Sequence, residues 1–280
     1  SFEKMQSSGI SLNAVTFVSI LKACGGSGNV DKGQELYAEI SRKGFVEKDV
    51  SIGNALIDMY SECNLLSKAR EVFNNLSTQD VVSWNRMMTG YIRHGHGEEA
   101  LALFIKMQLE GHLPNGVTYI SSLRACGNIE EAFYEGGELH ARIVGDSLLK
   151  ENPDVFRSLL AMYAHCGMLL KAKQLFEMRV VRDTASWNVL IAGFIDHACE
   201  EDALECIKKM QEQGVAFNSA TVICNMKACT SLGALEKLHK IHDEILFKGL
   251  IERDEVVGNA LVDAYMKCGS FNKAIEVFAT

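Results

Sequence analysis

The sequence repeats itself at a step of 102 to 103 residues. Trp84 and Trp187 lie 103 residues apart, and the triplet Lys-Met-Gln recurs at 4–6, 106–108 and 209–211. This step is longer than any single helical repeat, so it must divide into smaller repeats of one supersecondary element each. Such repeats cannot bury their apolar faces alone and must stack on their neighbours. The periodicity therefore predicts a solenoid.

The expected helix starts divide the step into three kinds of repeat, of 31, 35 and 36 to 37 residues. Complete repeats are predicted at 14–49, 50–80, 81–115, 116–152, 153–183, 184–218 and 219–254, with partial repeats at 1–13 and 255–280. Because the chain has no initiator Met and its terminal repeats are incomplete, we expect a piece of a longer array, with any targeting peptide outside it. The end repeats would then stack on further repeats of that array.

The apolar residues of each repeat follow the period of two α-helices. In the repeat 81–115, Trp84 and Met88 share one stripe of a first helix, and glycines at 95 and 97 interrupt that helix. The stripe of the second helix consists of Ala100, Leu103, Phe104 and Met107. This spacing is typical of a packing face. Since the chain has two prolines and no sustained strand pattern, the predicted fold is all-α, an α-solenoid superhelix of stacked antiparallel helix pairs.

The charge balance restricts the partners. The chain has 28 Lys plus Arg and 36 Asp plus Glu, a formal net charge of −8. This balance excludes a polybasic protein that binds nucleic acid or anionic membranes through bulk charge. Any nucleic acid must be held locally, with few phosphate contacts and a shallow salt dependence. No apolar run approaches the roughly 18 residues that span a bilayer, so no membrane partner is expected.

Six of the nine cysteines are repeat positions. Cys24, Cys126 and Cys229 lie 102 and 103 residues apart inside Lys-Ala-Cys or Arg-Ala-Cys, and a second series with the same step follows the tyrosines of the 31-residue repeats. A disulfide framework is typical of short secreted chains. Small buried thiols in a reducing compartment are therefore the favoured interpretation.

Several motifs resemble the pentatricopeptide repeat (PPR) family, and the alternation of repeat lengths resembles its PLS subclass. The motifs are Gly-Asn-Ala-Leu-Ile-Asp-Met-Tyr at 53–60, Val-Val-Ser-Trp-Asn at 81–85, Thr-Ala-Ser-Trp-Asn at 184–188, Gly-Ala-Leu-Glu at 233–236 and Gly-Asn-Ala-Leu-Val-Asp-Ala-Tyr at 258–265. The resemblance covers the whole chain. The tetratricopeptide repeat fits less well, because its step is fixed at 34 residues and its units end near a proline.

The resemblance implies binding of single-stranded RNA, one base per repeat, with the fifth and last residues of each repeat reading the base. The implied pairs are Asn54 with Asp80 for uracil, and Asn85 with Asn115 and Asn188 with Asn218 for cytosine. An asparagine amide offers both a donor and an acceptor, so the second residue of the pair can decide between the two pyrimidines. Asn259 opens an incomplete repeat and implies only a pyrimidine.

Other repeats depart from this pattern. Arg157 with Asp183 is outside the family's usual combinations, so no base is assigned to that repeat. The 36-residue and 37-residue repeats have aliphatic fifth residues, Val18, Ile120 and Ile223. An aliphatic side chain cannot hydrogen-bond a base, so these repeats are expected to act as spacers. The second residues Val82, Ala185 and Val256 resemble the family's apolar wedge between successive bases.

The last residue of a repeat has a second interpretation. Each complete repeat ends in Asn or Asp before an expected helix, where a short polar side chain caps free backbone amides. Capping alone would explain these residues. Because the long repeats keep the cap but lose the polar fifth residue, the joint pattern at Asn54, Asn85 and Asn188 carries the prediction of base reading.

No pattern for catalysis is found. Proteins of the PLS subclass often end in a cytidine-deaminase-like domain, whose zinc requires His-x-Glu and Cys-x-x-Cys. His-x-Glu occurs at 96–98 and 242–244, but no Cys-x-x-Cys follows. The Gly-Gly-Ser-Gly at 25–28 is predicted to be a turn between helices, not a phosphate loop. We expect no catalytic residue, metal or cofactor in the chain, and any catalytic domain would lie outside it.

These observations favour a sequence-specific single-stranded RNA-binding array. The resemblance implies that it is the target-recognition part of an organelle RNA-processing or C-to-U editing factor, in a mitochondrion or plastid, with other organelle RNA-processing proteins as partners. The alternative is a non-catalytic scaffold in an organellar ribosome or another ribonucleoprotein complex. The acidic balance, the pair Arg157 and Asp183, and the aliphatic fifth residues favour that alternative.

Overall fold

The computed structural model describes residues 13–45, 49–129, 133–180, 182–247, 249, 251 and 254–279, and the regular structure in these ranges is entirely helical. The chain forms two compact units, divided between Val155 and Phe156. The helices of unit 1 are α2 (Ala14–Ser27), α3 (Val30–Arg42), α5 (Val50–Glu62), α6 (Leu66–Asn74), α7 (Val81–Arg93), α8 (Gly97–Leu109), α9 (Gly116–Gly127), α10 (Phe133–Gly145) and α11 (Leu148–Glu151). Helix α12 (Pro153–His165) contains the division. Unit 2 continues with α13 (Leu169–Glu177), α14 (Thr184–Asp196), α15 (Glu200–Glu212), α16 (Ser219–Ser231), α17 (Leu235–Phe247), α19 (Glu255–Lys267) and α20 (Phe271–Phe278).

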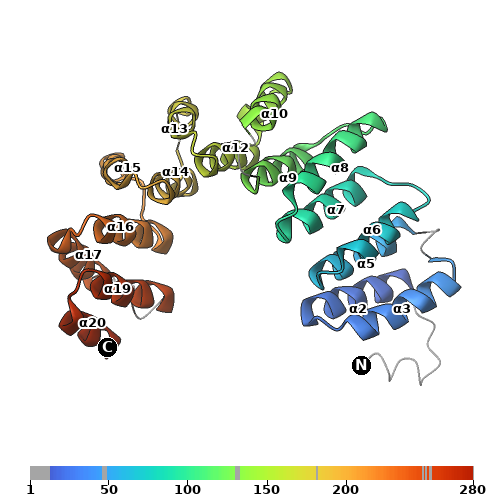
Figure 1. The fold of residues 1–280 in the computed structure, drawn as a ribbon, viewed down its shortest axis with the longest axis horizontal. Helices are drawn as coiled ribbons and strands as arrows, with labels where there is room; N and C mark the ends of the chain where they lie inside the picture. The colour runs from blue at the N-terminus through green and yellow to red at the C-terminus, as the bar shows by residue number, and fades with distance from the viewer. Residues whose placement is uncertain are drawn as a thin grey trace. The chain divides into compact units, whose positions relative to one another are not determined.

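Within each unit, consecutive helices form pairs, and the first helices of successive pairs pack on one another (Figure 1). In unit 1, α2 contacts α5, α5 contacts α7, and α7 contacts α9. In unit 2, α14 contacts α16, and α16 contacts α19. Stacked helix pairs of this kind make an α-solenoid, which confirms the predicted fold class. The boundaries of the individual repeats stay predictions.

An aromatic contact joins successive pairs at a repeated position. Trp84 of α7 is fully buried and packs edge to face on Phe73 of α6, with ring centroids 4.7 Å apart. Trp187 of α14 packs on Phe176 of α13 in the same way, at 4.5 Å. The second-helix stripe predicted for α8 is also buried, at Ala100, Leu103, Phe104 and Met107. The stripes are therefore packing faces.

A histidine bridge between first helices was not predicted. Nε2 of His94 at the end of α7 donates to the carbonyl oxygen of Ser61 in α5, 2.7 Å away. In unit 2, Nε2 of His197 lies 2.9 Å from the carbonyl oxygen of Ala164 in α12. Carbonyls in the last turn of a helix lack full intrahelical partners. The imidazole therefore ties the C-terminal end of one first helix to the next.

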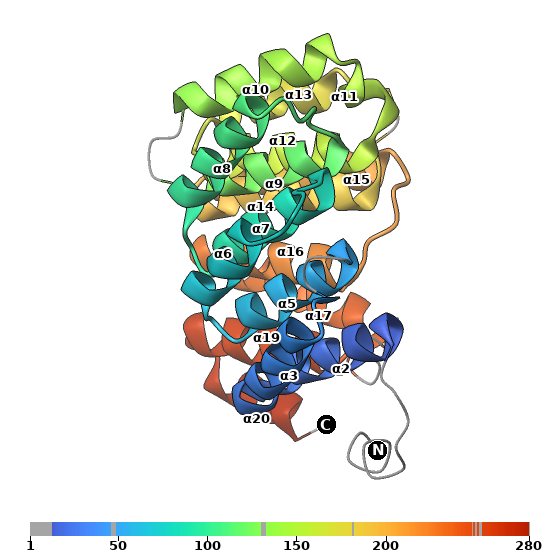
Figure 2. The same ribbon diagram turned by 90° about the vertical axis from the view of Figure 1, so that its right-hand side faces the viewer.

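Two local features differ from the sequence predictions. The expected turn at 25–28 is wrong in part, because α2 continues to Ser27 and only Gly28, with φ 67°, takes the left-handed conformation. Gly25 is buried inside α2, where a Cβ would approach Cα of Met59 to 3.3 Å, so this glycine serves helix packing. In addition, the short helix α11 follows α10 (Figure 2).

The cysteines are thiols, as expected. None of the nine is in a disulfide, and Cys24, Cys126, Cys206 and Cys229 are buried. The Lys-Ala-Cys and Arg-Ala-Cys series is thus confirmed as buried, whereas the series after the tyrosines is only partly buried. Burial raises the pKa of Cys206 to about 11, which keeps that thiol protonated and unreactive.

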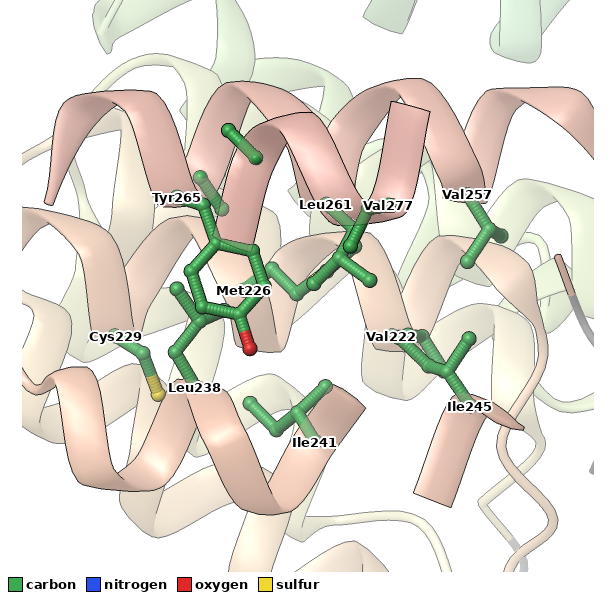
Figure 3. Close-up of a cluster of buried hydrophobic side chains, with 12 residues drawn as sticks. Val222, Met226, Cys229, Leu238, Ile241, Ile245, Val257, Leu261, Tyr265 and Val277 are labelled. Carbon is green, nitrogen blue, oxygen red and sulfur yellow. The ribbon is translucent and has the colours of Figure 1, made fainter. Parts of the chain in front are cut away.

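Apolar side chains from α16, α17, α19 and α20 form the core at the end of unit 2 (Figure 3). Leu238, Leu261 and Tyr265 are fully buried in this cluster. His242 of α17 borders it, 8% exposed, with Nδ1 3.0 Å from the hydroxyl of Tyr265. Within the described ranges, no helix is both long and apolar enough to cross a bilayer.

We predict that protonation of His242 destabilises unit 2. Burial, and next the charge of Lys273, lowers the pKa of His242 below its ordinary value of 6.5. The unfolded chain therefore binds more protons just below pH 6.5, so the stabilisation is complete above that pH and is lost as the pH falls. Thermal unfolding between pH 7 and 5 should show a smaller loss of Tm for His242→Asn than for the wild type. The control His96→Asn, at an exposed site, should lose as much Tm as the wild type over this pH range. If the Tm of His242→Asn falls in parallel with that of the wild type, the prediction is contradicted.

Candidate nucleic-acid interface

The last residue of each predicted repeat caps the following first helix. Oδ1 of Asp80 accepts the backbone N–H of Ser83 at 2.8 Å and its hydroxyl at 2.8 Å. Oδ1 of Asn115 accepts the N–H of Thr118 at 3.0 Å, and the Thr118 hydroxyl accepts the N–H of Asn115, which completes a capping box. The other last residues whose side chains accept backbone N–H groups in this way are Asn13, Asp49, Asn152, Asp183, Asn218 and Asp254. These last residues therefore act as helix N-caps, as the capping interpretation predicts.

The fifth residue of a repeat contacts the last residue across adjacent first helices. Nδ2 of Asn85 on α7 donates to Oδ1 of Asn115 before α9, at 3.3 Å. Nδ2 of Asn188 on α14 donates to Oδ1 of Asn218 before α16, at 2.9 Å. The fold thus brings together the two members of both pairs, which are 30 residues apart in the sequence.

Capping leaves one polar atom of each last residue available. In Asn115 and Asn218, Oδ1 accepts the cap bonds and the amide of the fifth residue, so the free group is the Nδ2 amide, a donor. In Asp80, Oδ1 is the cap and Oδ2 makes no hydrogen bond with a described residue, so the free group is an acceptor. Capping and reading of a base are compatible, because they use different atoms of the same side chain.

The repeat with Arg157 has no such free atom. Oδ1 of Asp183 accepts the N–H of Ser186 at 2.8 Å, and Oδ2 accepts Nη1 of Arg157 at 2.9 Å. Burial alone would raise the pKa of Asp183, but the hydrogen bonds from Ser186 and the charge of Arg157 outweigh it and lower the pKa. The carboxylate is therefore ionised and doubly occupied. In this repeat, the last residue therefore has no free oxygen to offer a base.

Asn54 and Asn85 bury polar atoms where packing does not require them. Both side chains are nearly inaccessible, and their Oδ1 atoms have no hydrogen-bond partner among the described residues. An unpaired buried acceptor costs about 1–3 kcal/mol. At the same position, other repeats have Val18, Ile120 and Ile223. An asparagine that lowers stability there is best explained by a role other than packing.

Exposed apolar side chains stand beside the caps, at the second residue of the predicted repeats. Val82 is 47% and Val256 62% exposed, and Ala185 is also exposed. Val15 and Val117, which were not singled out from the sequence, occupy the same position and are also exposed. An exposed aliphatic surface beside a polar pair suits contact with the face of a base.

A pocket in unit 1 brings the pair Asn54 and Asp80 together with Val82. No hydrogen bond joins Asn54 and Asp80, so their proximity is shown by the fact that both side chains line this pocket. Arg86 also lines the pocket, in an ion pair with Asp58, and Lys22 of α2 lies on its wall. The sequence prediction missed both cations, although Lys22 belongs to the recurring Lys-Ala-Cys motif.

The described residues offer no metal centre, since no group of three or more His, Cys, Asp or Glu side chains converges among them. Of the two His-x-Glu sequences, one contributes the exposed His96, 3.4 Å from Glu99. The other contributes His242, which borders the core. Asn259 lies on α19, and its predicted partner falls outside the chain.

Comparison with known proteins identifies similar repeats. Models of the PPR repeat match residues 15–45, 54–80, 154–178, 185–215 and 259–279, and a PPR repeat family model matches 79–128. A chloroplastic pentatricopeptide repeat-containing protein of Arabidopsis thaliana is 34% identical over 95% of the chain. A mitochondrial one from the same plant is 32% identical over 100%. The chain spans 42% and 27% of the lengths of these two relatives.

A solved structure is similar in fold. The pentatricopeptide repeat protein PPR10 in complex with an 18-nt psaJ RNA element superposes with a TM-score of 0.72 and 20% sequence identity. The match covers 99% of the present chain and 41% of PPR10. At this identity the similarity establishes the fold.

Proposed function

The chain belongs to the pentatricopeptide repeat family, and we propose that it binds single-stranded RNA and selects bases through the pairs described above. The observation that carries this proposal is the pairing of Asn85 with Asn115 and of Asn188 with Asn218, in which the cap leaves a free amide. The solved relative PPR10 is an RNA complex, which supports the same ligand class. Modular reading of unpaired bases by helical repeats is physically established.

The free atoms indicate which pyrimidine each pair prefers. The ring nitrogen N3 of cytosine is an acceptor and suits the amide of Asn115 or Asn218. N3–H of uracil is a donor and suits Oδ2 of Asp80. The amides of Asn85 and Asn188 hold Oδ1 of their partners Asn115 and Asn218, while Val82 and Ala185 would contact the base faces.

Equilibrium binding to short unpaired RNAs tests the proposal. The matched RNA runs 5′ to 3′ in parallel with the chain. It carries U at the repeat of Asn54, C at the repeat of Asn85, any base at each of the next two repeats, and C at the repeat of Asn188. The control RNA carries purines at these three places. We expect tighter binding of the first by about 1–3 kcal/mol per read base. Equal and weak binding of the two RNAs would instead favour the alternative function, a scaffold in a ribonucleoprotein complex. A protein partner would then be sought.

A gain of reading is expected from Arg157→Asn. The substitution removes the guanidinium from Oδ2 of Asp183 and places an amide at the fifth position, which recreates the combination of Asn54 and Asp80. Binding should then distinguish uracil from adenine at this register by about 1–3 kcal/mol, whereas the wild type should not. Arg157→Ala is the matched control, since it frees Asp183 without supplying the amide. Identical base profiles for both variants would show that the pair alone does not read a base.

For the whole protein, we propose the target-recognition part of an organelle RNA-processing or C-to-U editing factor of the PLS subclass. The predicted repeat lengths and the chloroplastic and mitochondrial names of the relatives support this. We assign no catalytic step to the described residues. Sequencing of organelle transcripts from cells lacking the protein tests the role, because loss of editing or processing next to a matching pyrimidine pattern is expected.

A further inference from the structure

Three exposed cations occupy one position of the long repeats. Lys22 on α2, Arg124 on α9 and Lys227 on α16 precede Ala-Cys in each case, 102 and 103 residues apart. Each lies four residues after the aliphatic fifth residue of its repeat, and therefore on the same helix face. All three are exposed, and none makes an ion pair with a described residue. By contrast, many other cations of the chain are paired, as Arg157 and Lys209 are.

The surroundings of two of these cations recur 205 residues apart. In unit 1 a pocket is lined by Val18, Lys22, Ala55 and Asp58 among others, and in unit 2 a pocket is lined by Ile223, Lys227, Ala260 and Asp263 among others. Each pocket lies between the first helix of a long repeat and the first helix of the next. Four lining positions, an aliphatic residue, a lysine, an alanine and an aspartate, therefore recur in both pockets, once in each unit.

One acid in each pocket is already in an ion pair. Asp58 pairs with Arg86, and Asp263 pairs with Lys267 at 2.8 Å. Neither Lys22 nor Lys227 makes an ion pair with a described residue, although Asp58 and Asp80 line the first pocket and Asp263 lines the second. In a chain of net charge −8, an unpaired cation at a recurring place is a specific attraction for an anion.

The position of Lys22 indicates which anion these cations bind. Its pocket also contains Asn54, Asp80 and Val82, so a strand whose base reaches that pair carries its phosphate within the reach of a lysine side chain. We propose that Lys22, Arg124 and Lys227 bind the phosphate backbone of the single-stranded RNA, an inference that rests on the proposed function. The long repeats then anchor the strand between reading repeats, in addition to the predicted role of spacers that read no base.

The test compares two charge-matched triple variants. Lys22→Gln, Arg124→Gln and Lys227→Gln remove the proposed contacts, and Arg42→Gln, Lys150→Gln and Lys240→Gln remove exposed cations of α3, α11 and α17. Both variants bring the formal net charge from −8 to −11. Affinity for the matched RNA and for its purine control is measured from 50 to 200 mM salt, with Tm as the check on folding.

We expect the first variant to lower the slope of log K against log salt by about 2, because each of three phosphate contacts contributes about 0.7 on single strands. The fourfold rise in salt should then weaken wild-type binding about 20-fold more than it weakens the variant. The preference for the matched RNA should be unchanged, and the control variant should keep the wild-type slope. An unchanged slope in the first variant, an equal change in both, or loss of base preference overturns the inference while leaving the proposed function intact. Failure of the wild type to bind either RNA overturns both.

Discussion

Replacing both Asn85 and Asn188 by alanine is expected to abolish the preference for cytosine at two registers and to leave the fold intact. Each fifth-position amide donates to the last residue of its pair, so alanine removes one member of the pair and releases the other. At about 1–3 kcal/mol per read base, the combined loss of discrimination is about 2–6 kcal/mol. Stability should change little at position 85, because the Oδ1 that is removed has no partner.

The measurement is equilibrium binding of the double variant to RNAs with cytosine or adenine at the two registers. Ile120→Ala with Ile223→Ala is the matched control, since both residues occupy the same position in long repeats. The control should retain the wild-type preference. An undiminished cytosine preference in the double variant would remove the asparagines from the reading site and leave capping as the only role of their partners.

The largest effect on stability is expected from Trp84→Ala. The indole is fully buried and packs on Phe73 at the contact between α6 and α7. Truncation of a buried tryptophan costs about 3–5 kcal/mol, because the removed surface is lost and a cavity remains. In a stacked array, each repeat is stabilised chiefly by its neighbours, so the damage should be greatest where α6 meets α7.

Urea unfolding combined with amide hydrogen exchange locates this effect. We expect a lower unfolding midpoint and a selective loss of protection in α6 and α7. Val82→Ala, two residues away in the same helix but 47% exposed, is the control and should leave both measurements near the wild type. Uniform loss of protection in both units would mean that the array unfolds as one cooperative body and that nearest-neighbour stacking does not describe it.

The fold was accessible from the sequence because its physical signal is local and repeated. Trp84 with Trp187 and the stripe from Ala100 to Met107 fix helix faces by periodicity alone, and the structure confirms them as buried. The sequence prediction that was wrong in part, the turn at 25–28, concerns a segment in contact with a neighbouring helix. The glycine at 25 lies inside α2 where this helix closely approaches α5, a contact that no local pattern records.

The candidate site divides in the same way. The sequence supplied the paired positions through its resemblance to the pentatricopeptide repeat family, which implies that the fifth and last residues of a repeat act together. It also supplied the capping role of the last residue, since Asn or Asp before a helix is a local signal. Of these two conclusions, only the capping role follows from the chain's own residues without the resemblance.

Only the tertiary structure decided which atoms remain free. The cap uses one atom of Asn115 or Asp80, a guanidinium occupies the second oxygen of Asp183, and Arg86 pairs with Asp58. The cap bonds are local, but Arg157 and Arg86 belong to different helices from Asp183 and Asp58 and lie 26 and 28 residues away from them in the chain. Hydrogen bonds and ion pairs depend on distances of a few ångströms between such helices. Periodicity determines the face on which a residue lies, whereas the packing of neighbouring helices determines what that residue can still bind.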